Sequence, residues 1–232
     1  MNPPNTLPKY IELSERLIRD IGAGRLLDGE RLPPERELAR QLGASVGTLR
    51  KALAELTERG LLERRQGSGN YIRHAENTGS IYSMFRLELH AGGGLPTAEI
   101  LAVDTLDKPG DLPTFGTSHR GTRIRRLRFL DRTPIAVEEI WLDADMGELT
   151  RETISDSLYH TYQSRLGFWI ARAEDRVGIG TVPAWAPPGF SLPPGTTCGY
   201  ITRLSWSEPE HPVEFSQTWF DTARALYVQR LK

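Results

Sequence analysis

Only two residues, Gly43 and Ala44, separate two segments of this chain that both have the pattern of an α-helix. The earlier segment, 32–43, has prolines near its start, acidic residues in its first turn and a closing glycine, as helices commonly do. The later segment opens at Ser45, a good N-terminal cap, turns leucines inward and stops at Gly60. So tight a connection sets the second helix across the first. It predicts a helix-turn-helix, whose second helix can enter a major groove of DNA.

One further helix and a short hairpin flank this motif. Apolar residues recur at helical spacing over 8–21, which predicts a helix with one buried stripe. After the motif, 61–65 and 70–73 predict two strands joined by the glycine-rich loop 66–69. Arginines flank this hairpin, and its glycines let the backbone approach a sugar-phosphate chain. We therefore expect the hairpin to act as a DNA-binding wing.

Charge divides unevenly along the chain, in the sense expected if its first part binds DNA. Residues 1–75 hold 13 Lys and Arg against 10 Asp and Glu, whereas residues 76–232 hold 16 against 20. Each basic residue that neutralises a phosphate releases counterions and so favours binding. The bias is mild, and an ordinary solvated surface would also produce it. It supports the motif without standing alone.

Several other classes of protein are excluded by composition. The chain has 232 residues, of which 25% are charged and 38% hydrophobic, as is ordinary for a globular protein. No stretch approaches the roughly 18 apolar residues of a membrane helix, and the N-terminus does not have the pattern of a signal peptide. A single cysteine, Cys198, leaves no intramolecular disulfide, and the five histidines lack metal-ligand spacing. We expect a cytoplasmic protein with no metal, cofactor or membrane contact.

Beyond a polar stretch at 74–80, which we interpret as a linker, the pattern becomes that of strands. Six segments read as strands: 100–105, 122–130, 134–142, 169–180, 197–207 and 213–220. The clearest helix is 157–167, with a serine cap and a glycine stop. Antiparallel strands with few helices predict an α+β domain.

Period-2 geometry in two of these strands points to a binding face. Arg126 and Arg128 fall on one side of their strand, opposite Leu127, and Glu214 shares a side of a later strand with Phe220. Two arginines that face one way can hold a carboxylate or a phosphate. The alternative is that they only pair with Glu138 or Glu214 across the sheet, and periodicity alone does not separate the two readings.

Three segments of the first 73 residues resemble the signature segments of the GntR family of bacterial regulators, in order and at similar spacing. They are 32–39 (LPPERELA), 45–53 (SVGTLRKAL) and 65–69 (RQGSG). The resemblance implies DNA contacts at the second helix, the start of the third and the wing tip; the matching residues are Arg36, Ser45, Thr48, Arg50 and Gly67. Many relatives have arginine where this chain has Val46, which leaves one base contact open. For Arg36 the alternative is an intrahelical ion pair.

Residues 81–228 resemble, more loosely, the UTRA ligand-binding domain of the HutC subfamily, which shares its fold with chorismate lyase. The matching segments are 126–128, 134–138, 157–159, 212–216 and 220–221. The resemblance implies that these positions line an effector pocket. Arg126 and Arg128 would bind an anion, Glu138 and Glu214 would accept from hydroxyl or amino groups, and Ser157, Tyr159 and Phe220 would complete the lining. Phe220 stands where some relatives have tyrosine, which leaves a hydroxyl contact open.

Together these interpretations predict a winged helix-turn-helix domain at 1–73, a linker at 74–80, and at 81–232 an antiparallel-sheet UTRA domain for effector binding and dimerisation. The function we expect is a metabolite-responsive repressor that binds a two-fold, palindromic operator as a homodimer. One alternative is a constitutive DNA-binding protein whose second domain only dimerises. Another is a lyase-like enzyme with Glu138 or Glu214 as general base, although no nucleophile and base are legible together.

Overall fold

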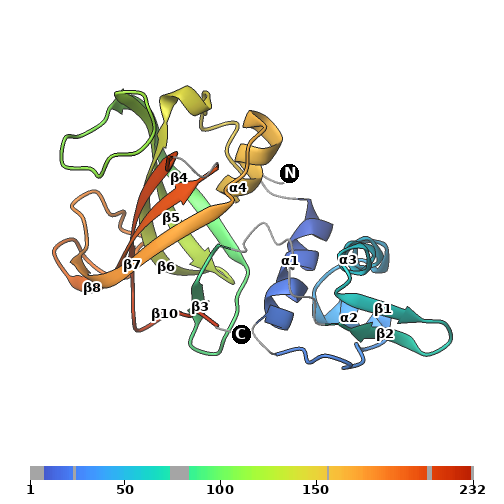
Figure 1. Ribbon diagram of the computed structural model, residues 1–232. Coiled ribbons are helices and arrows are strands. Elements are labelled where there is room, and N and C mark those ends of the chain that lie inside the picture. Colours follow the sequence, from blue (N-terminus) through green and yellow to red (C-terminus); the bar gives the residue numbers. More distant parts are fainter. Residues whose placement is uncertain (1–7, 23–24, 74–83, 156, 208–210, 231–232) are drawn as a thin grey trace. The chain divides into compact units, whose positions relative to one another are not determined.

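The computed structural model describes residues 8–22, 25–73, 84–155, 157–207 and 211–230 (Figure 1). By their contacts these residues form two compact units. The first unit holds the described residues up to 73 together with 84–85 and 91–95, and the second holds 86–90 and 96–230. The predicted linker, 74–80, lies outside the described residues, so the domain boundaries stay a prediction.

The first unit consists of three helices and a two-stranded antiparallel hairpin. The helices are α1 (Lys9–Gly22), α2 (Glu35–Gln41) and α3 (Val46–Glu58), and the hairpin pairs β1 (Leu62–Arg65) with β2 (Gly69–Ile72). The leucines that the sequence directs inward from α3, among them Leu49 and Leu56, are fully buried in one core with α1 and β2. The predicted helix-turn-helix and hairpin are both present.

Helix α2 is shorter than the sequence predicted, because the prediction included the prolines. A residue that precedes proline is pushed toward the extended region, so a helical conformation is disfavoured at both Leu32 and Pro33. Pro34 is extended too, with ψ of 141°, and the helix begins at Glu35. Leu32 instead packs into the core and donates its backbone N–H to Asn70 O at 2.9 Å.

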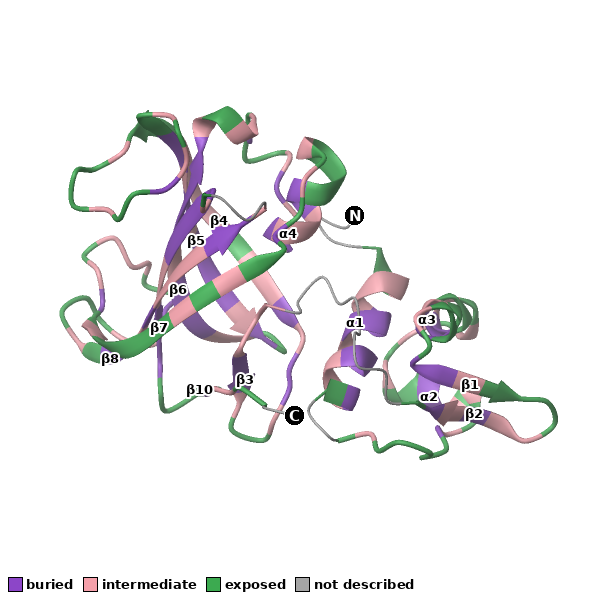
Figure 2. Ribbon diagram, in the orientation of Figure 1, coloured by how far each residue is buried: buried purple, intermediate pink, exposed green. Residues whose placement is uncertain are grey.

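The second unit is built on a six-stranded antiparallel sheet in the order β4-β5-β6-β9-β8-β7 (Figure 1). Its strands are β4 (Pro96–Asp107), β5 (Arg120–Leu130), β6 (Thr133–Asp143), β7 (Arg172–Thr181), β8 (Thr197–Trp206) and β9 (Glu214–Phe220). All six overlap the predicted segments, although β4 is longer than the predicted 100–105 and β7 begins three residues after the predicted 169. Figure 2 shows the central strands largely buried and the edge strand β7 largely exposed. A separate pair, β3 (Leu87–Leu89) with β10 (Ala225–Tyr227), was not predicted.

Different segments cover the two faces of the sheet. One face packs against α4 (Leu158–Thr161) and the π-helical turn η2 (Tyr162–Leu166), and a short 3-10 turn, η1 (Ala144–Met146), follows β6. The predicted helix 157–167 therefore has the right cap and the right glycine stop, but its second half is wound more widely than an α-helix. The proline-rich loop 183–195 covers the other face, with Phe190 and Trp185 packed near Leu127 and Trp219.

Candidate functional site

The exposed start of α3 carries two of the expected DNA contacts, Ser45 and Thr48. Ser45 Oγ accepts a hydrogen bond from the Thr48 backbone N–H at 3.1 Å and so caps the helix, as predicted. The two hydroxyl oxygens lie 2.8 Å apart and share a hydrogen bond. Because the first N–H groups of a helix have no carbonyl partner within it, this end of α3 favours a phosphate oxygen, which the two hydroxyls can also contact.

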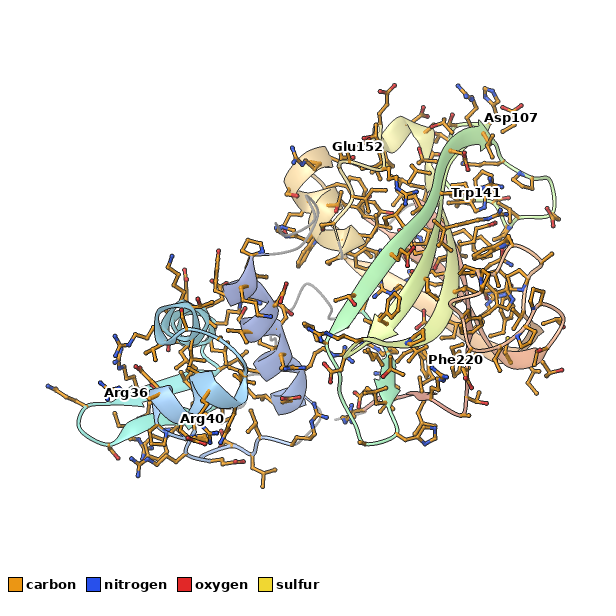
Figure 3. The ribbon with its side chains drawn as sticks, turned by 180° about the vertical axis from the view of Figure 1, so that it is seen from behind. Arg36, Arg40, Asp107, Trp141, Glu152 and Phe220 are labelled. Atoms are coloured by element: carbon orange, nitrogen blue, oxygen red, sulfur yellow. The ribbon has the colours of Figure 1, made fainter. Side chains whose placement is uncertain are left out.

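Arg36 projects from α2 and is exposed (Figure 3). Both neighbouring glutamates are engaged elsewhere. Glu37 accepts hydrogen bonds from Arg40 and Gln41, which lower the pKa of its carboxyl group. Glu35 accepts from Arg50. Among the described residues no carboxylate pairs with Arg36, so the intrahelical ion pair is not formed and the guanidinium is exposed.

Arg50 lies in the second turn of α3 and is likewise exposed. Its Nε donates to Glu35 Oε2 at 2.6 Å. The other oxygen of Glu35 lies 3.6 Å from Nη2 of Arg64, in β1 of the wing. The sequence analysis did not single out Glu35, although it stands in the segment that carries the resemblance, one residue before Arg36.

The tip of the wing is a tight turn that requires glycine. Gly67 has φ of +74°, which side-chain-bearing residues rarely adopt, and no heavy atom lies within 4 Å of where its Cβ would be. Beside it, the Arg65 guanidinium lies over the Tyr71 ring at 4.3 Å, and the Tyr71 hydroxyl hydrogen-bonds Ser68 at 2.7 Å. These two contacts stabilise the turn, and the space outside Gly67 is open.

The second candidate site is one face of the six-stranded sheet. Residues paired across antiparallel strands share a face. Arg126 pairs with Glu138, and Arg128 pairs with Ala136, whose other neighbour is Phe220. The same face carries Glu214 further along β9. The structure thus brings five of the expected effector residues onto one face, as period-2 geometry indicated.

Arg126 and Glu138 form a buried ion pair on this face. Arg126 donates from Nε at 3.0 Å and from Nη2 at 2.6 Å to one oxygen of Glu138, and Arg128 Nη1 lies 3.9 Å from the same oxygen. Burial tends to raise the pKa of Glu138, but the charges of Arg126 and Arg128 outweigh it and hold that pKa below its usual value. Arg126 Nη1 is buried and has no hydrogen-bond partner within the described part of the chain. The pairing across the sheet exists, yet it leaves one buried donor.

The sequence left open whether Arg126 and Arg128 pair with Glu138 or with Glu214, and Glu214 has other partners. It accepts hydrogen bonds from the Tyr162 hydroxyl at 2.5 Å, the Ser205 hydroxyl at 2.8 Å and the Tyr159 hydroxyl at 3.3 Å. Burial raises the pKa of Glu214 above its usual value even though the bonds from Tyr162 and Ser205 lower it. Glu214 and Tyr159 therefore belong to one buried network that ties α4 and η2 to β8 and β9.

Ser157 and Phe220 have structural roles that the resemblance does not convey. Ser157 Oγ accepts from the His160 backbone N–H at 3.3 Å and caps α4. Phe220 is buried, and its ring tip lies over Gly199 so closely that a Cβ there would stand 2.3 Å from Phe220 Cζ. Phe220 lies on the candidate face through its pairing with Ala136, and Ser157 stands at the start of α4, which packs against that face. The contacts described here are enough to explain both residues.

A third arginine on the same face was missed by the sequence analysis. Arg203 of β8 pairs with Ser216 of β9 and donates to Asp175 at 2.5 and 2.7 Å. Burial would raise the pKa of Asp175, but the bond and charge of Arg203 lower it. Arg203 also hydrogen-bonds Tyr159. Alternation along β8 places it on this face, so period 2 was a usable signal once the neighbouring strands were known.

Two kinds of site are not seen in the part of the chain that the structure describes. Nowhere in it do three or more His, Cys, Asp or Glu side chains gather in a way that would hold a metal ion. Nor does any described helix combine the length and apolar character needed to span a bilayer.

Comparison with protein families gives two matches that follow one another along the chain. Residues 9–72 match the family model of bacterial regulatory proteins of the gntR family, and residues 92–225 match the UTRA domain. Together they cover both structural units.

Individual proteins are similar over the same span. The HTH-type transcriptional regulator SmoD of Agrobacterium fabrum is 54% identical over 98% of this chain and 97% of its own length. The mannosyl-D-glycerate transport/metabolism system repressor MngR of Escherichia coli is 28% identical over 73% of each chain, and the repressor NagR of Bacillus subtilis is 27% identical over 98% of this chain and 93% of its own. Among solved structures, the possible transcriptional regulator YydK of Bacillus subtilis matches with a TM-score of 0.56, at 18% identity over 97% of this chain and all of that chain, which shows a shared fold.

Proposed function

This chain belongs to the GntR family of bacterial regulatory proteins and carries a UTRA domain, and from that membership we propose that it is a homodimeric repressor released from a palindromic operator by a small anionic metabolite. The family consists of bacterial regulatory proteins, and the relatives are named as HTH-type transcriptional regulators and repressors, not as enzymes. The reading of the second domain as a lyase-like enzyme is therefore wrong. The proposal places the protein in the cytoplasm with its DNA and in the HutC branch of the family.

On the DNA side, α3 would lie in the major groove with the wing beside it. Arg36 and Arg50 are exposed and would read base edges, whereas Ser45 and Thr48 at the start of α3 would contact phosphate. Gly67 would let the wing backbone approach the sugar-phosphate chain. Two heads related by a two-fold axis would require half-sites about one helical turn apart.

On the effector side, one observation carries the proposal: the buried Arg126 Nη1 has no partner within the described residues. An unpaired buried donor costs free energy, roughly 1–3 kcal/mol, which an acceptor on the ligand would recover. Arg128 adds a second positive charge on the same face. A carboxylate, phosphate or other anion of a small metabolite fits this pair.

The names of the relatives suggest a sugar-derived effector. One is the repressor of a mannosyl-D-glycerate system, and another is named a probable repressor of fructoselysine utilisation. Glu138 and the Glu214 network would then accept from the hydroxyl groups of the sugar. Arg126 and Arg128 are 4% and 3% exposed, so effector entry would require rearrangement above this face. A ligand with different affinity for the two arrangements shifts the equilibrium between them.

The DNA side is tested by selecting fragments of the source organism's DNA with the purified protein and sequencing those retained. A shared two-fold palindrome is the expected result, and the genes beside it would indicate which metabolites to try. Retention without a common site would contradict sequence-specific repression.

The effector side is tested by thermal unfolding in the presence of anionic sugars, since a ligand that binds only the folded state raises its stability. We expect one of them to raise the melting temperature and to release operator DNA. Arg126→Ala with Arg128→Ala should abolish both effects and leave operator binding intact.

The matched control is Arg125→Ala. Arg125 lies on the same strand but faces the other way and pairs with Glu139 at 2.6 Å. It should keep the response to the effector. Should no anionic metabolite stabilise the protein, the alternative of a constitutive DNA-binding protein with a purely dimerising second domain would be preferred.

A further inference from the structure

The predicted DNA-binding surface is formed by α2, the start of α3 and the wing, which is the hairpin of β1 and β2. Glu35 of α2 faces an arginine of α3 and an arginine of the wing. It is the first residue of α2, and its two oxygens face different arginines. Oε2 accepts from Arg50 in α3 at 2.6 Å, and Oε1 lies 3.6 Å from Nη2 of Arg64 in the wing. The Glu35 side chain is 18% exposed, whereas those of Arg50 and Arg64 are 63% and 71% exposed. Glu35 is thus set behind two arginines that face outward.

The geometry at Arg50 determines which of its donors remain. Nε, nearest the chain, is used by Glu35. The terminal Nη1 and Nη2 have no partner within the described residues. These are two of the donors with which arginine can contact O6 and N7 of guanine together. Because a guanidinium is planar, fixing Nε fixes the plane in which the terminal groups lie.

We propose that Glu35 is a positioning residue for base recognition: it orients the Arg50 guanidinium toward the DNA and so sets the preference for a guanine rather than adding affinity. A negative charge close to DNA opposes binding to any sequence, since it repels phosphate. A carboxylate here therefore weakens binding to all DNA while it fixes one contact that discriminates among bases. The inference rests on the proposed function as a sequence-specific DNA-binding regulator.

The sequence offers a matched control on the same helix. Glu37 is another glutamate of α2, but it accepts hydrogen bonds from Arg40 and Gln41 and not from an arginine of α3. Glu35→Gln and Glu37→Gln each remove one negative charge from α2. Only the first weakens the contact to Arg50.

The experiment measures the affinity of the full-length protein for two duplexes, one carrying the palindrome recovered from genomic selection and one with the same bases scrambled. Both variants should bind the scrambled duplex somewhat more tightly than the wild type, because each removes a negative charge. Only Glu35→Gln should lose preference for the palindrome, by about tenfold, in the range of one bidentate base contact. Glu37→Gln should keep the wild-type ratio within about twofold, since no base contact changes.

A double-mutant cycle shows whether Glu35 acts through Arg50. Arg50→Lys keeps the charge but removes the two parallel donors of the guanidinium. It should itself lower the ratio of the affinity for the palindrome to the affinity for the scrambled duplex. If Glu35 works by orienting Arg50, adding Glu35→Gln to Arg50→Lys should lower the ratio no further. Independent, multiplying losses would overturn the inference, as would a wild-type ratio in Glu35→Gln.

Two further outcomes are separable. A wild type that binds both duplexes equally would refute the proposed function, and the inference with it. If Glu35→Gln melts below the assay temperature, Glu35→Asp keeps the charge but withdraws the carboxylate by one methylene. It should lose preference for the palindrome without tighter binding to the scrambled duplex, and an unchanged preference would again overturn the inference.

Discussion

Gly199 in β8 lies directly under the ring of Phe220, its paired residue in β9. A Cβ at position 199 would stand 2.3 Å from Phe220 Cζ and 2.4 Å from Cε1, far inside van der Waals contact. The φ of Gly199 is not in the left-handed region, so the main chain accepts alanine and only the ring opposes it. Phe220 is buried and its ring cannot swing into solvent. We therefore expect Gly199→Ala to force the ring and its surroundings aside.

Forcing one extra methyl group into a packed site typically costs about 1–3 kcal/mol. For a protein of this length, that corresponds to a fall in the melting temperature of roughly 2–12 °C. Replacing the Phe220 ring with a smaller side chain should relieve the strain. Phe220→Leu alone leaves space and destabilises, but the double variant should be less destabilised than the sum of the two, with a coupling free energy of about 1 kcal/mol or more.

Urea unfolding followed by tryptophan fluorescence measures these differences. All five tryptophans lie between positions 141 and 219, so the signal reports on the second unit. Strict additivity of the two substitutions, within about 0.5 kcal/mol, would refute the argument that Phe220 is what alanine meets. A Gly199→Ala protein as stable as the wild type would refute the clash itself.

Three other substitutions test contacts described above. Ser157→Ala should lower the free energy of unfolding by about 1 kcal/mol through loss of the α4 cap, and an unchanged urea midpoint would mean that Ser157 is not a cap. Arg59→Ala removes the guanidinium 3.2 Å from the fully buried Glu15 and should cost about 3 kcal/mol, measured by circular dichroism of the helices, and a loss under about 1 kcal/mol would contradict it. Because burial raises the pKa of Glu214, its contribution to stability is complete below the ordinary carboxyl pKa and is lost as pH rises through the raised one. The wild type should therefore lose stability relative to Glu214→Gln as pH rises above about 4, the ordinary pKa of a glutamate, and parallel stability–pH curves would count against this assignment.

Local signals made the first unit predictable. The serine cap of α3 and the spacing of its leucines depend only on residues close in the sequence, and the structure reproduces them. The one error, at α2, came from letting the leading prolines count as helix, although each restricts the residue before it. The contacts of Glu35 were not predictable, because its partner Arg50 lies fifteen positions away on another helix.

The second unit was predictable in its strands and less so in its site. Six strands of seven to twelve residues leave a clear alternation, whereas β3 and β10 have three residues each and pair across more than a hundred positions. Alternation also placed Arg126 and Arg128 on one side of β5. It gave no register between strands, and the register decides that Glu138 faces Arg126 while Glu214 lies with tyrosines and Ser205.

In both candidate sites a glutamate binds part of an arginine guanidinium and leaves its other nitrogens unbound within the described residues. In the first unit, Glu35 binds Nε of Arg50 and leaves its terminal nitrogens; in the second, Glu138 binds Nε and Nη2 of Arg126 and leaves Nη1. A free arginine loses up to about 2 kcal/mol of side-chain entropy when a ligand fixes it, and a carboxylate behind it means that much of this loss has already occurred on folding. The same carboxylate also opposes an anionic ligand. The arrangement therefore exchanges affinity for orientation, which suits a regulator that must release its DNA and its effector as well as recognise them.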